Sequence, residues 1–275
     1  MAGTLYLVGT PIGNLGDFSP RAVETLRSVD FIAAEDTRVT LKLLNHFEIR
    51  KPLICYFEHN RAEMGEKLLN RLLAGESCAL VTDAGMPAIS DPGEDIVRQC
   101  AAHGVTVAAV PGPSALVTAL ALSGLPTQRF TFEGFLSTTT KNRREHLESL
   151  KGEKRTMIFY EAPHKLLRTL ADLLENFGDR DVALCRELTK VHEEVIRTTL
   201  SGALARFTET PPKGEFVLVL AGAPETAGPE MSAEDALVLV ERYRAEGRSL
   251  KEACKLAAAD SGFGKNELYE MAIGK

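Results

Sequence analysis

Two acidic residues, Asp83 and Asp91, stand in a loop whose composition is typical of a ligand-binding site. Residues 82–93 read TDAGMPAISDPG and hold two Asp, two Gly and two Pro directly after the apolar run SCALV (77–81). Glycine lets a backbone approach a ligand closely, proline fixes the shape of a loop, and carboxylates accept hydrogen bonds. The segment therefore predicts a pocket for a polar ligand. The alternative is a long connection without function.

Two other loops have a similar character. VGTPIGN (8–14) and VPGPSA (110–115) also follow apolar runs. The ligand crevice of an open α/β sheet lies outside the carboxyl ends of its strands, so the three loops would line one edge. None of them contains a lysine, which favours a nucleoside-sized ligand over a triphosphate. The first loop matches neither GxGxxG nor the P-loop pattern, which argues against NAD binding and nucleotide hydrolysis.

The elements that would position these loops alternate along the first part of the chain. Apolar runs are separated by segments with helical periodicity, which is typical of a mostly parallel sheet covered on both faces. The predicted strands are 4–10, 31–36, 52–57, 77–83 and 105–111. We therefore predict an N-terminal α/β domain over residues 1–115 that carries the three loops.

The pattern then changes. Two of the later strand candidates, 181–188 and 193–200, are too close together to enclose a helix and predict an antiparallel hairpin. The other predicted strands are 129–135, 155–162 and 215–222, with helices over 141–151, 163–177 and 201–207. We predict a second, mixed α/β domain (116–222), a linker rich in Pro, Gly and Ala (223–230) and a helical module (231–275).

Composition limits the class of protein. The chain has 275 residues, is 44% hydrophobic and contains no apolar stretch approaching the ~20 residues that span a membrane. Its N-terminus lacks the basic region of a secretory signal. The five cysteines include no CxxC pair, which predicts reduced thiols in the cytoplasm and no zinc site or other metal centre.

Charge restricts how nucleic acid could bind. The net charge is -6, so an RNA partner would need a local basic surface. Residues 141–155 hold six basic and three acidic side chains, and residues 242–255 hold five and two. Either segment could follow a phosphate backbone, and the alternative for each is a solvated helix face.

Several motifs occur together in the order found in one family. They are TPIGN (10–14), AEDTR (34–38), TDAGMPAISDPG, PGPSA (111–115), EGF (133–135), FYEAPHK (159–165), RELTK (186–190) and GEFVLV (214–219). On these motifs the chain resembles the bacterial 16S ribosomal RNA cytidine 2'-O-methyltransferases of the small-subunit methyltransferase I type, within the tetrapyrrole methylase superfamily. The resemblance covers essentially the whole chain. It departs from the family at Met86, where Thr is usual, and at Ala162 and Lys165, where Ser and Arg are commoner.

The resemblance implies two α/β domains that hold S-adenosylmethionine in the cleft between them. It also implies that the protein acts on 16S rRNA in the small ribosomal subunit, and we expect it to be a homodimer. The residues implied to bind the donor are Pro11, Gly13, Asn14, Asp83, Ala84, Gly85, Pro111, Ser114, Ala115, Tyr160 and Leu188. For Ser114 the alternative role is a helix N-cap.

Transfer to a ribose 2'-hydroxyl needs an in-line approach and is helped by a base, because that hydroxyl is a poor nucleophile. Glu161 and Glu187 are the candidate catalytic residues, since each follows a predicted strand of the second domain. The alternative for Glu161 is an inter-strand ion pair with Arg186. The basic residues expected to bind RNA are Arg38, Arg186, Lys190, Arg242, Arg248, Lys251 and Lys255.

Two rival functions remain open. One is methylation of a tetrapyrrole or another small molecule. The motif TPIGN argues against it, because porphyrin-type relatives usually carry GxGxGD there. The other is a non-catalytic regulator that binds RNA or a ligand and has kept the donor pocket.

Overall fold

The computed structural model describes residues 2–224 and 231–274. Contacts divide the chain into two compact units, Met1–Gly222 and Ala223–Lys275, and each is described by itself. The predicted linker, 223–230, falls mainly on residues 225–230, which lie outside the described residues. The predicted domain boundaries at 115/116 and 222/223 stay predictions.

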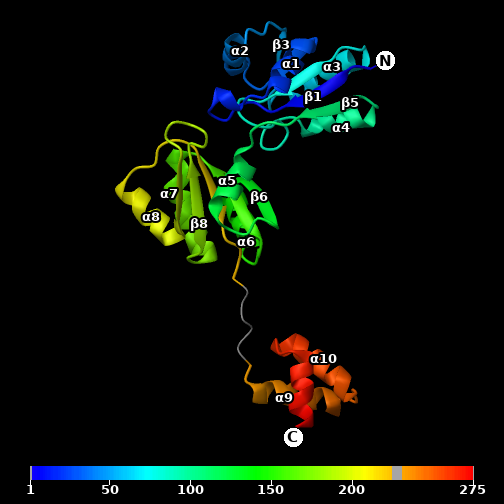
Figure 1. Ribbon diagram of the computed structural model, residues 1–275, viewed down its shortest axis with the longest axis vertical. Coiled ribbons are helices and arrows are strands. Elements are labelled where there is room, and N and C mark those ends of the chain that lie inside the picture. The colour runs from blue at the N-terminus through cyan, green and yellow to red at the C-terminus, as the bar shows by residue number, and fades with distance from the viewer. Residues whose placement is uncertain (1, 225–230, 275) are drawn as a thin grey trace. The chain divides into compact units, whose positions relative to one another are not determined.

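Within residues 2–224, the first sheet is entirely parallel and has the strand order β3-β2-β4-β1-β5. Its strands are β1 (Thr4–Val8), β2 (Phe31–Ala34), β3 (Leu53–Cys55), β4 (Cys78–Val81) and β5 (Thr106–Val110). Helices α1 (Pro20–Ser28) and α2 (Thr37–His46) cover one face, and α3 (Arg61–Leu73) and α4 (Glu94–Ala102) cover the other (Figure 1). The prediction of a mostly parallel sheet is confirmed.

Strand β4 shows why the strands of this sheet read as continuous apolar runs. Successive side chains of a strand point to opposite faces. Cys78 and Leu80 pack in the core under α3 and α4, whereas Ala79 and Val81 pack in the core under α1 and α2. A parallel sheet covered on both faces therefore leaves β4 without a solvent-facing side, and all four residues are buried.

The second sheet of this unit is mixed, with the order β6-β7-β10-β8-β9. Its strands are β6 (Phe130–Phe135), β7 (Thr156–Glu161), β8 (Asp181–Arg186), β9 (Glu194–Thr199) and β10 (Phe216–Leu220). The β6–β7 pair is parallel and the others are antiparallel, so the predicted hairpin of β8 and β9 is confirmed. Helix α5 (Ala115–Ser123) packs on one face, and α6 (Thr140–Ser149), α7 (Pro163–Phe177) and α8 (Leu200–Glu209) pack on the other.

The unit Ala223–Lys275 is helical where it is described. Helices α9 (Ala233–Ala245), α10 (Leu250–Ser261) and α11 (Lys265–Ile273) bury a small core of Ala236, Val240, Ala253, Cys254, Ala257 and Leu268. Ser249 and Glu252 form a capping box that begins α10. The prediction of a helical C-terminal module is confirmed. In the part of the chain that the structure describes, no helix has the length and apolar character needed to cross a membrane.

Candidate functional site

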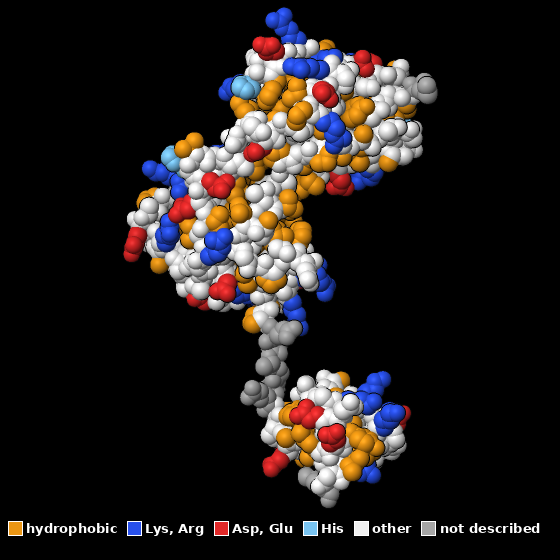
Figure 2. Space-filling model, in the orientation of Figure 1, with side chains coloured by type: hydrophobic (Ala, Val, Ile, Leu, Met, Phe, Trp, Pro, Cys, Tyr) orange, Lys and Arg blue, Asp and Glu red, His pale blue; other side chains and the backbone are white. Residues whose placement is uncertain are grey.

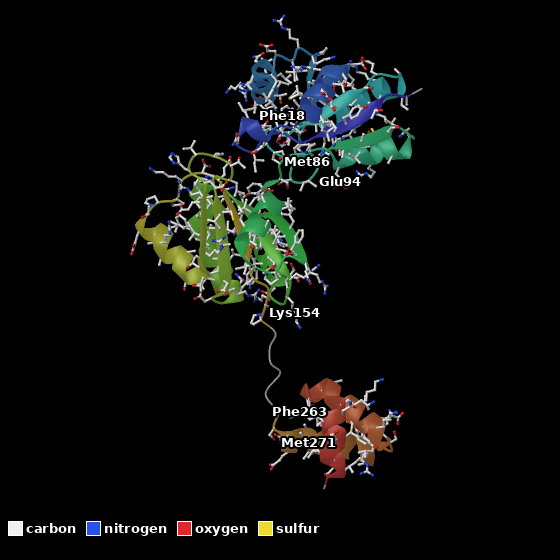
Figure 3. All side chains as sticks on the ribbon, viewed as in Figure 1. Phe18, Met86, Glu94, Lys154, Phe263 and Met271 are labelled. Carbon is white, nitrogen blue, oxygen red and sulfur yellow. The ribbon has the colours of Figure 1, made fainter. Side chains whose placement is uncertain are left out.

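A cavity of about 380 Å³ lies in the unit Met1–Gly222, between one edge of each sheet. Because the first sheet is parallel, its carboxyl ends share an edge, and the loops after β1, β4 and β5 reach the cavity from there. The carboxyl ends of β6 and β7 and the amino end of β10 supply much of the other wall. Figure 3 shows Met86, one of the lining residues, on the side of the first sheet that faces the second. Hydrophobic side chains are visible along the face where the two sheets approach each other (Figure 2).

The cavity brings together most of the residues predicted to bind the donor. Those that line it are Asp83, Ala84, Gly85, Ser114, Ala115, Tyr160 and Leu188. Pro11, Gly13, Asn14 and Pro111 do not line it. From the first loop it is Ile12 that reaches the wall.

Two of the predicted residues that do not line the cavity, Asn14 and Gly13, have other roles in the structure. The Asn14 side chain accepts a hydrogen bond from the Gly16 amide at 2.9 Å and caps a short 3-10 helix, Leu15–Asp17. Gly13 packs against the loop after β8, since a Cβ there would lie 2.4 Å from Lys190 Cγ and 3.1 Å from the Leu188 carbonyl oxygen. Both residues therefore shape the first loop beside the cavity, and direct contact of either one with the donor stays a prediction.

Glycines in the first-domain loops hold the loops against one another. A Cβ on Gly9 would lie 2.7 Å from the Gly112 Cα, so these loops meet where neither residue has a side chain. Thr10 and Gly85 exchange backbone hydrogen bonds of 2.9 and 3.1 Å. The amide and carbonyl of Gly85 are thus occupied within the protein. Gly85 is required for its positive φ of +89° and not as a backbone donor to a ligand.

Helix α5 begins at the cavity. Ser114 has the extended N-cap conformation, but its side chain makes no cap hydrogen bond. Ser114 therefore occupies the N-cap position, as its alternative role predicts, but leaves its hydroxyl group free of a cap hydrogen bond. Ser114 and Ala115 both line the cavity, so the positive end of the α5 dipole is available to a negatively charged group.

Three carboxylates, Glu35, Asp83 and Asp91, line the first-domain wall. Glu35 follows β2, which pairs with β4, and the Thr82 hydroxyl after β4 donates to Glu35 Oε2 at 2.7 Å. Burial, followed by the charge of Glu35, raises the pKa of Asp83. Burial likewise raises the pKa of Asp91 to about 6, with Glu35 and Asp83 contributing. Because neighbouring like charges destabilise one another, this wall favours a cationic ligand.

The second-domain wall contains one buried carboxylate, that of Glu161, which is 3% exposed at the end of β7. Its Oε1 accepts from the Ala162 amide at 2.9 Å, and its Oε2 accepts from the Thr169 hydroxyl at 2.5 Å. Arg143 donates to the same Thr169 hydroxyl at 2.8 Å and is itself held by Asp172 at 2.6 Å. The side chain of Glu161 is therefore held in place by residues of α6 and α7, and each carboxylate oxygen keeps a lone pair that these hydrogen bonds do not use.

The alternative pairing of Glu161 with Arg186 is wrong. Strand β10 lies between β7 and β8, so that Phe216 opposes both residues. Arg186 instead donates to Glu194 at 3.0 Å and to the Lys213 carbonyl at 2.7 Å.

Glu187 does not line the cavity. One of its carboxylate oxygens accepts from the Glu215 amide and from Lys190 Nζ, both at 2.9 Å. These bonds, led by the one from Glu215, lower the pKa of Glu187. Its φ of +52° lies in the left-handed region, so the backbone turns at Glu187 directly after β8. The geometry thus favours a structural role over the predicted catalytic one.

The basic residues predicted to bind RNA differ in whether their side chains already form ion pairs. Arg38 is bonded to Asp36, Arg186 to Glu194, and Lys190 to Glu187 and Glu215. Arg242 lies 3.5 Å from Glu246. In the described part of the C-terminal unit, Arg248, Lys251 and Lys255 are exposed and have no carboxylate within ion-pair distance. These last three are the most available to phosphate.

Sequence reasoning missed several lining residues, including Phe135 and Phe216. Glu35 is a candidate from the sequence, because it lies in the motif AEDTR at the end of β2, and β2 pairs with β4. Phe135 depends on an irregularity in β6, for which Gly134 inside the predicted strand 129–135 is the signal in the sequence. Among residues 2–224 and 231–274, no group of three or more His, Cys, Asp or Glu side chains is arranged to hold a metal ion.

Comparison with known proteins gives a consistent result. The family model of the Tetrapyrrole (Corrin/Porphyrin) Methylases matches residues 4–204. Two solved structures share the fold at low identity. Uroporphyrin-III-C-methyltransferase from Thermus thermophilus has a TM-score of 0.55 at 20% identity over 79% of this chain and 94% of its own. Diphthine synthase has a TM-score of 0.59 at 17% identity over 79% and 89%.

The sequence relatives are much closer. The chain is 50% identical over 272 residues, 98% of each chain, to "Ribosomal RNA small subunit methyltransferase I" of Synechocystis sp.. It is 47% identical to the protein of that name from Bacillus subtilis, over 98% of this chain and 93% of the other. The Thermotoga maritima protein of that name is 50% identical over 220 residues, which is 80% of this chain and 99% of its own. The chain therefore belongs to the tetrapyrrole methylase family and, within it, to the ribosomal RNA small subunit methyltransferase I group.

Proposed function

We propose that this protein transfers a methyl group from S-adenosylmethionine to the 2'-oxygen of a cytidine ribose in 16S rRNA of the small ribosomal subunit. The observation that carries the proposal is the cavity between the two sheets. One wall holds three carboxylates and the start of α5, and the other holds the single buried carboxylate of Glu161. The names of the close relatives support the choice of ribosomal RNA as the substrate.

The lining residues fit this donor. A cavity of about 380 Å³ is within the range of small-molecule sites. Asp83 and Asp91 suit its cationic groups, and the α5 N-terminus at Ser114 suits its carboxylate. Ile12, Met86 and Leu188 supply apolar surface. When bound, the donor supplies an electrophilic sulfonium methyl group.

Glu161 is the residue that we assign to the hydroxyl of the substrate. Glu161 lines the cavity, and its carboxylate is held by Ala162 and Thr169 at both oxygens, so the direction of the carboxylate is fixed before any substrate enters. A free lone pair on Glu161 Oε1 or Oε2 accepts the hydrogen bond of the 2'-hydroxyl and then its proton. Arg143 acts through Thr169 and is a positioning residue.

The C-terminal unit is proposed to add affinity for the ribosomal particle. Its exposed Arg248, Lys251 and Lys255 lie on or directly before α10 and are suited to phosphate contacts. The matched length of the Thermotoga maritima relative, 220 residues, is close to that of the unit Met1–Gly222. We therefore assign donor binding and the reaction to the first unit. Homodimer formation and a cytoplasmic location remain predictions.

The direct test is incubation of the purified protein with labelled donor and small ribosomal subunits that lack the modification. Mass spectrometry of nuclease fragments should locate one cytidine that carries a methyl group on its ribose. Free tetrapyrrole, offered in parallel, should remain unmodified. Methylation of the tetrapyrrole, or donor binding without any transfer, would support one of the two rival functions.

A truncation separates the two units. A chain ending at Gly222 should bind the donor with wild-type affinity, because the cavity is lined entirely by residues before Ala223. Its methylation of subunits should fall and should depend less steeply on salt, by about one unit of slope for each phosphate contact removed. Full activity after truncation would move the RNA surface to residues 141–155. Lost donor binding would mean that the C-terminal unit supports the fold.

A further inference from the structure

Strand β6 contains an irregularity that redirects one aromatic side chain. Phe132 pairs with Ile158, but Gly134 pairs with Phe159 and Phe135 with Tyr160, so one extra residue is inserted at Glu133. In a regular strand, Phe132 and Phe135 would point to opposite faces of the sheet. The inserted residue shifts the alternation of side chains by one position, so that Phe132 and Phe135 point to the same face. Gly134 accommodates the bulge with a φ of +61°. A β-bulge beside a functional site commonly re-aims a side chain in this way.

The redirected ring lies at the cavity. The rings of Phe132 and Phe135 both contact Tyr160, with centroid separations of 4.9 and 5.6 Å and edge-on geometry. Phe135 and Tyr160 line the cavity, but Phe135 is 58% exposed. The bulge therefore moves a large apolar ring out of the core and into solvent at the cavity wall. Such exposure loses the free energy of burial unless a ligand covers the ring.

We propose that Phe135 is a stacking platform for the target nucleobase of the RNA. The target nucleotide would be rotated out of the base stack so that its ribose can enter the cavity. This proposal rests on the proposed function. Enzymes that act on a nucleotide inside a structured nucleic acid commonly extrude it, and an aromatic face offsets part of the unstacking cost. Ring surface of Phe135 is available to a base because the side chain is 58% exposed, and its contact with Tyr160 is edge-on and not a parallel stack.

Position favours the nucleobase over the donor as the partner of this ring. The methyl group of the donor must face the substrate. We therefore expect the donor to lie deeper in the cavity than the residues at its entrance, which the RNA contacts first. Phe135 is the lining aromatic residue at the solvent side, whereas Tyr160 and Phe216 are more enclosed. The carboxylates suited to the cationic donor come from the other wall.

The test compares two phenylalanines of the same strand. Phe130 is also exposed, at 37%, but does not line the cavity. The variant Phe135→Ala should keep its donor affinity within about twofold, and its kcat/KM for small ribosomal subunits should fall about 5- to 150-fold. Phe130→Ala should keep both quantities within about twofold. Phe135→Tyr, which retains a flat ring, should restore most of the lost kcat/KM.

A fluorescence measurement reports stacking without requiring methyl transfer. The chain contains no Trp, so Phe135→Trp introduces a single reporter. Adding a short oligocytidylate in the presence of S-adenosylmethionine should quench this fluorescence, because a stacked base quenches indole. The matched variant Phe130→Trp should show no quenching under the same conditions.

Two results would overturn the proposal. Wild-type kcat/KM in Phe135→Ala, together with no quenching in Phe135→Trp, would exclude stacking. A loss of donor affinity in Phe135→Ala as large as its loss of kcat/KM would assign the ring to the donor. A different result, in which the wild-type protein binds the donor but methylates no RNA, would refute the proposed function and this proposal with it.

Discussion

The two walls of the cavity are built in different ways. The first-domain wall consists of loops that support one another through contacts between glycines and the Thr10–Gly85 backbone pair, and its polar side chains are carboxylates. The second-domain wall is formed largely by strand ends, with the rings of Phe135, Tyr160 and Phe216 and one buried carboxylate, that of Glu161. Loops thus supply charge on one side, and a rigid sheet supplies shape and a fixed acceptor on the other.

The difference indicates a division of labour. Several partly exposed carboxylates can adapt to a cationic ligand, but they repel one another when that ligand is absent. Glu161 is held by Ala162 and Thr169, and Thr169 in turn by Arg143. The orientation of the Glu161 carboxylate is therefore fixed before a ligand binds. Preorganised groups of this kind are suited to chemistry more than to affinity. We therefore assign donor binding mainly to the first wall and reaction at the ribose to the second.

The largest effect is expected at Glu161. Glu161→Gln keeps the size of the side chain but removes the proton acceptor, so kcat on small ribosomal subunits should fall about 10²- to 10⁴-fold. Single-turnover methylation measures this loss, and thermal unfolding checks that the fold persists. Activity within threefold of wild type would remove Glu161 from the reaction and leave the carboxylates of the first wall as candidates.

A change at Gly85 should break the first wall. Its φ of +89° is unfavourable for a β-branched residue, so Gly85→Val should displace the loop and weaken donor binding by about tenfold or more. Calorimetric titration with S-adenosylmethionine measures the effect. Gly104→Val is the matched control, since Gly104 also has a positive φ, +67°, but lies outside the cavity with open space around it. Equal donor affinity in both variants would contradict a role for this loop.

The charge of the first wall should make donor binding depend on pH. Burial raises the pKa of Asp91 to about 6, so its carboxyl group is mostly neutral below that pH and mostly ionised above it. Donor affinity should therefore decrease as the pH falls through about 6, and titrations on either side of that value measure the change. In Asp91→Asn the decrease should be smaller. An unchanged profile in the variant would assign the titration to another group.

The smallest effect is expected at Met86. The family usually has Thr at this position, and the Met86 sulfur packs against the Gly9 backbone, 2.7 Å from where a Cβ on Gly9 would lie. Met86→Thr should change donor affinity and turnover by less than about threefold, because the contacts of the loop are mainly backbone ones. A larger loss of affinity would show that the thioether contacts the donor.

Much of the fold was predictable because its signals are local. Strands β2 and β4 of the first sheet are buried on both faces, so they appear as continuous apolar runs, and the short gap between β8 and β9 required a hairpin. The contents of the cavity were less predictable because they depend on pairing between distant segments. Glu187 lies in a motif next to a strand end, but its bonds to Glu215 and Lys190 become visible only once β8 and β10 are paired. Phe135 required the bulge in β6.

The division of labour between the walls is tested most directly by calorimetric titration of S-adenosylmethionine into one charge-neutralised variant of each wall, above pH 6. We predict that Asp91→Asn binds the donor about tenfold more weakly than wild type, a difference of about 1.4 kcal/mol. Glu161→Gln should bind it within about twofold of wild type. The opposite result, with donor affinity lost in Glu161→Gln and kept in Asp91→Asn, would contradict the assignment of donor binding to the first wall and of the reaction to the second.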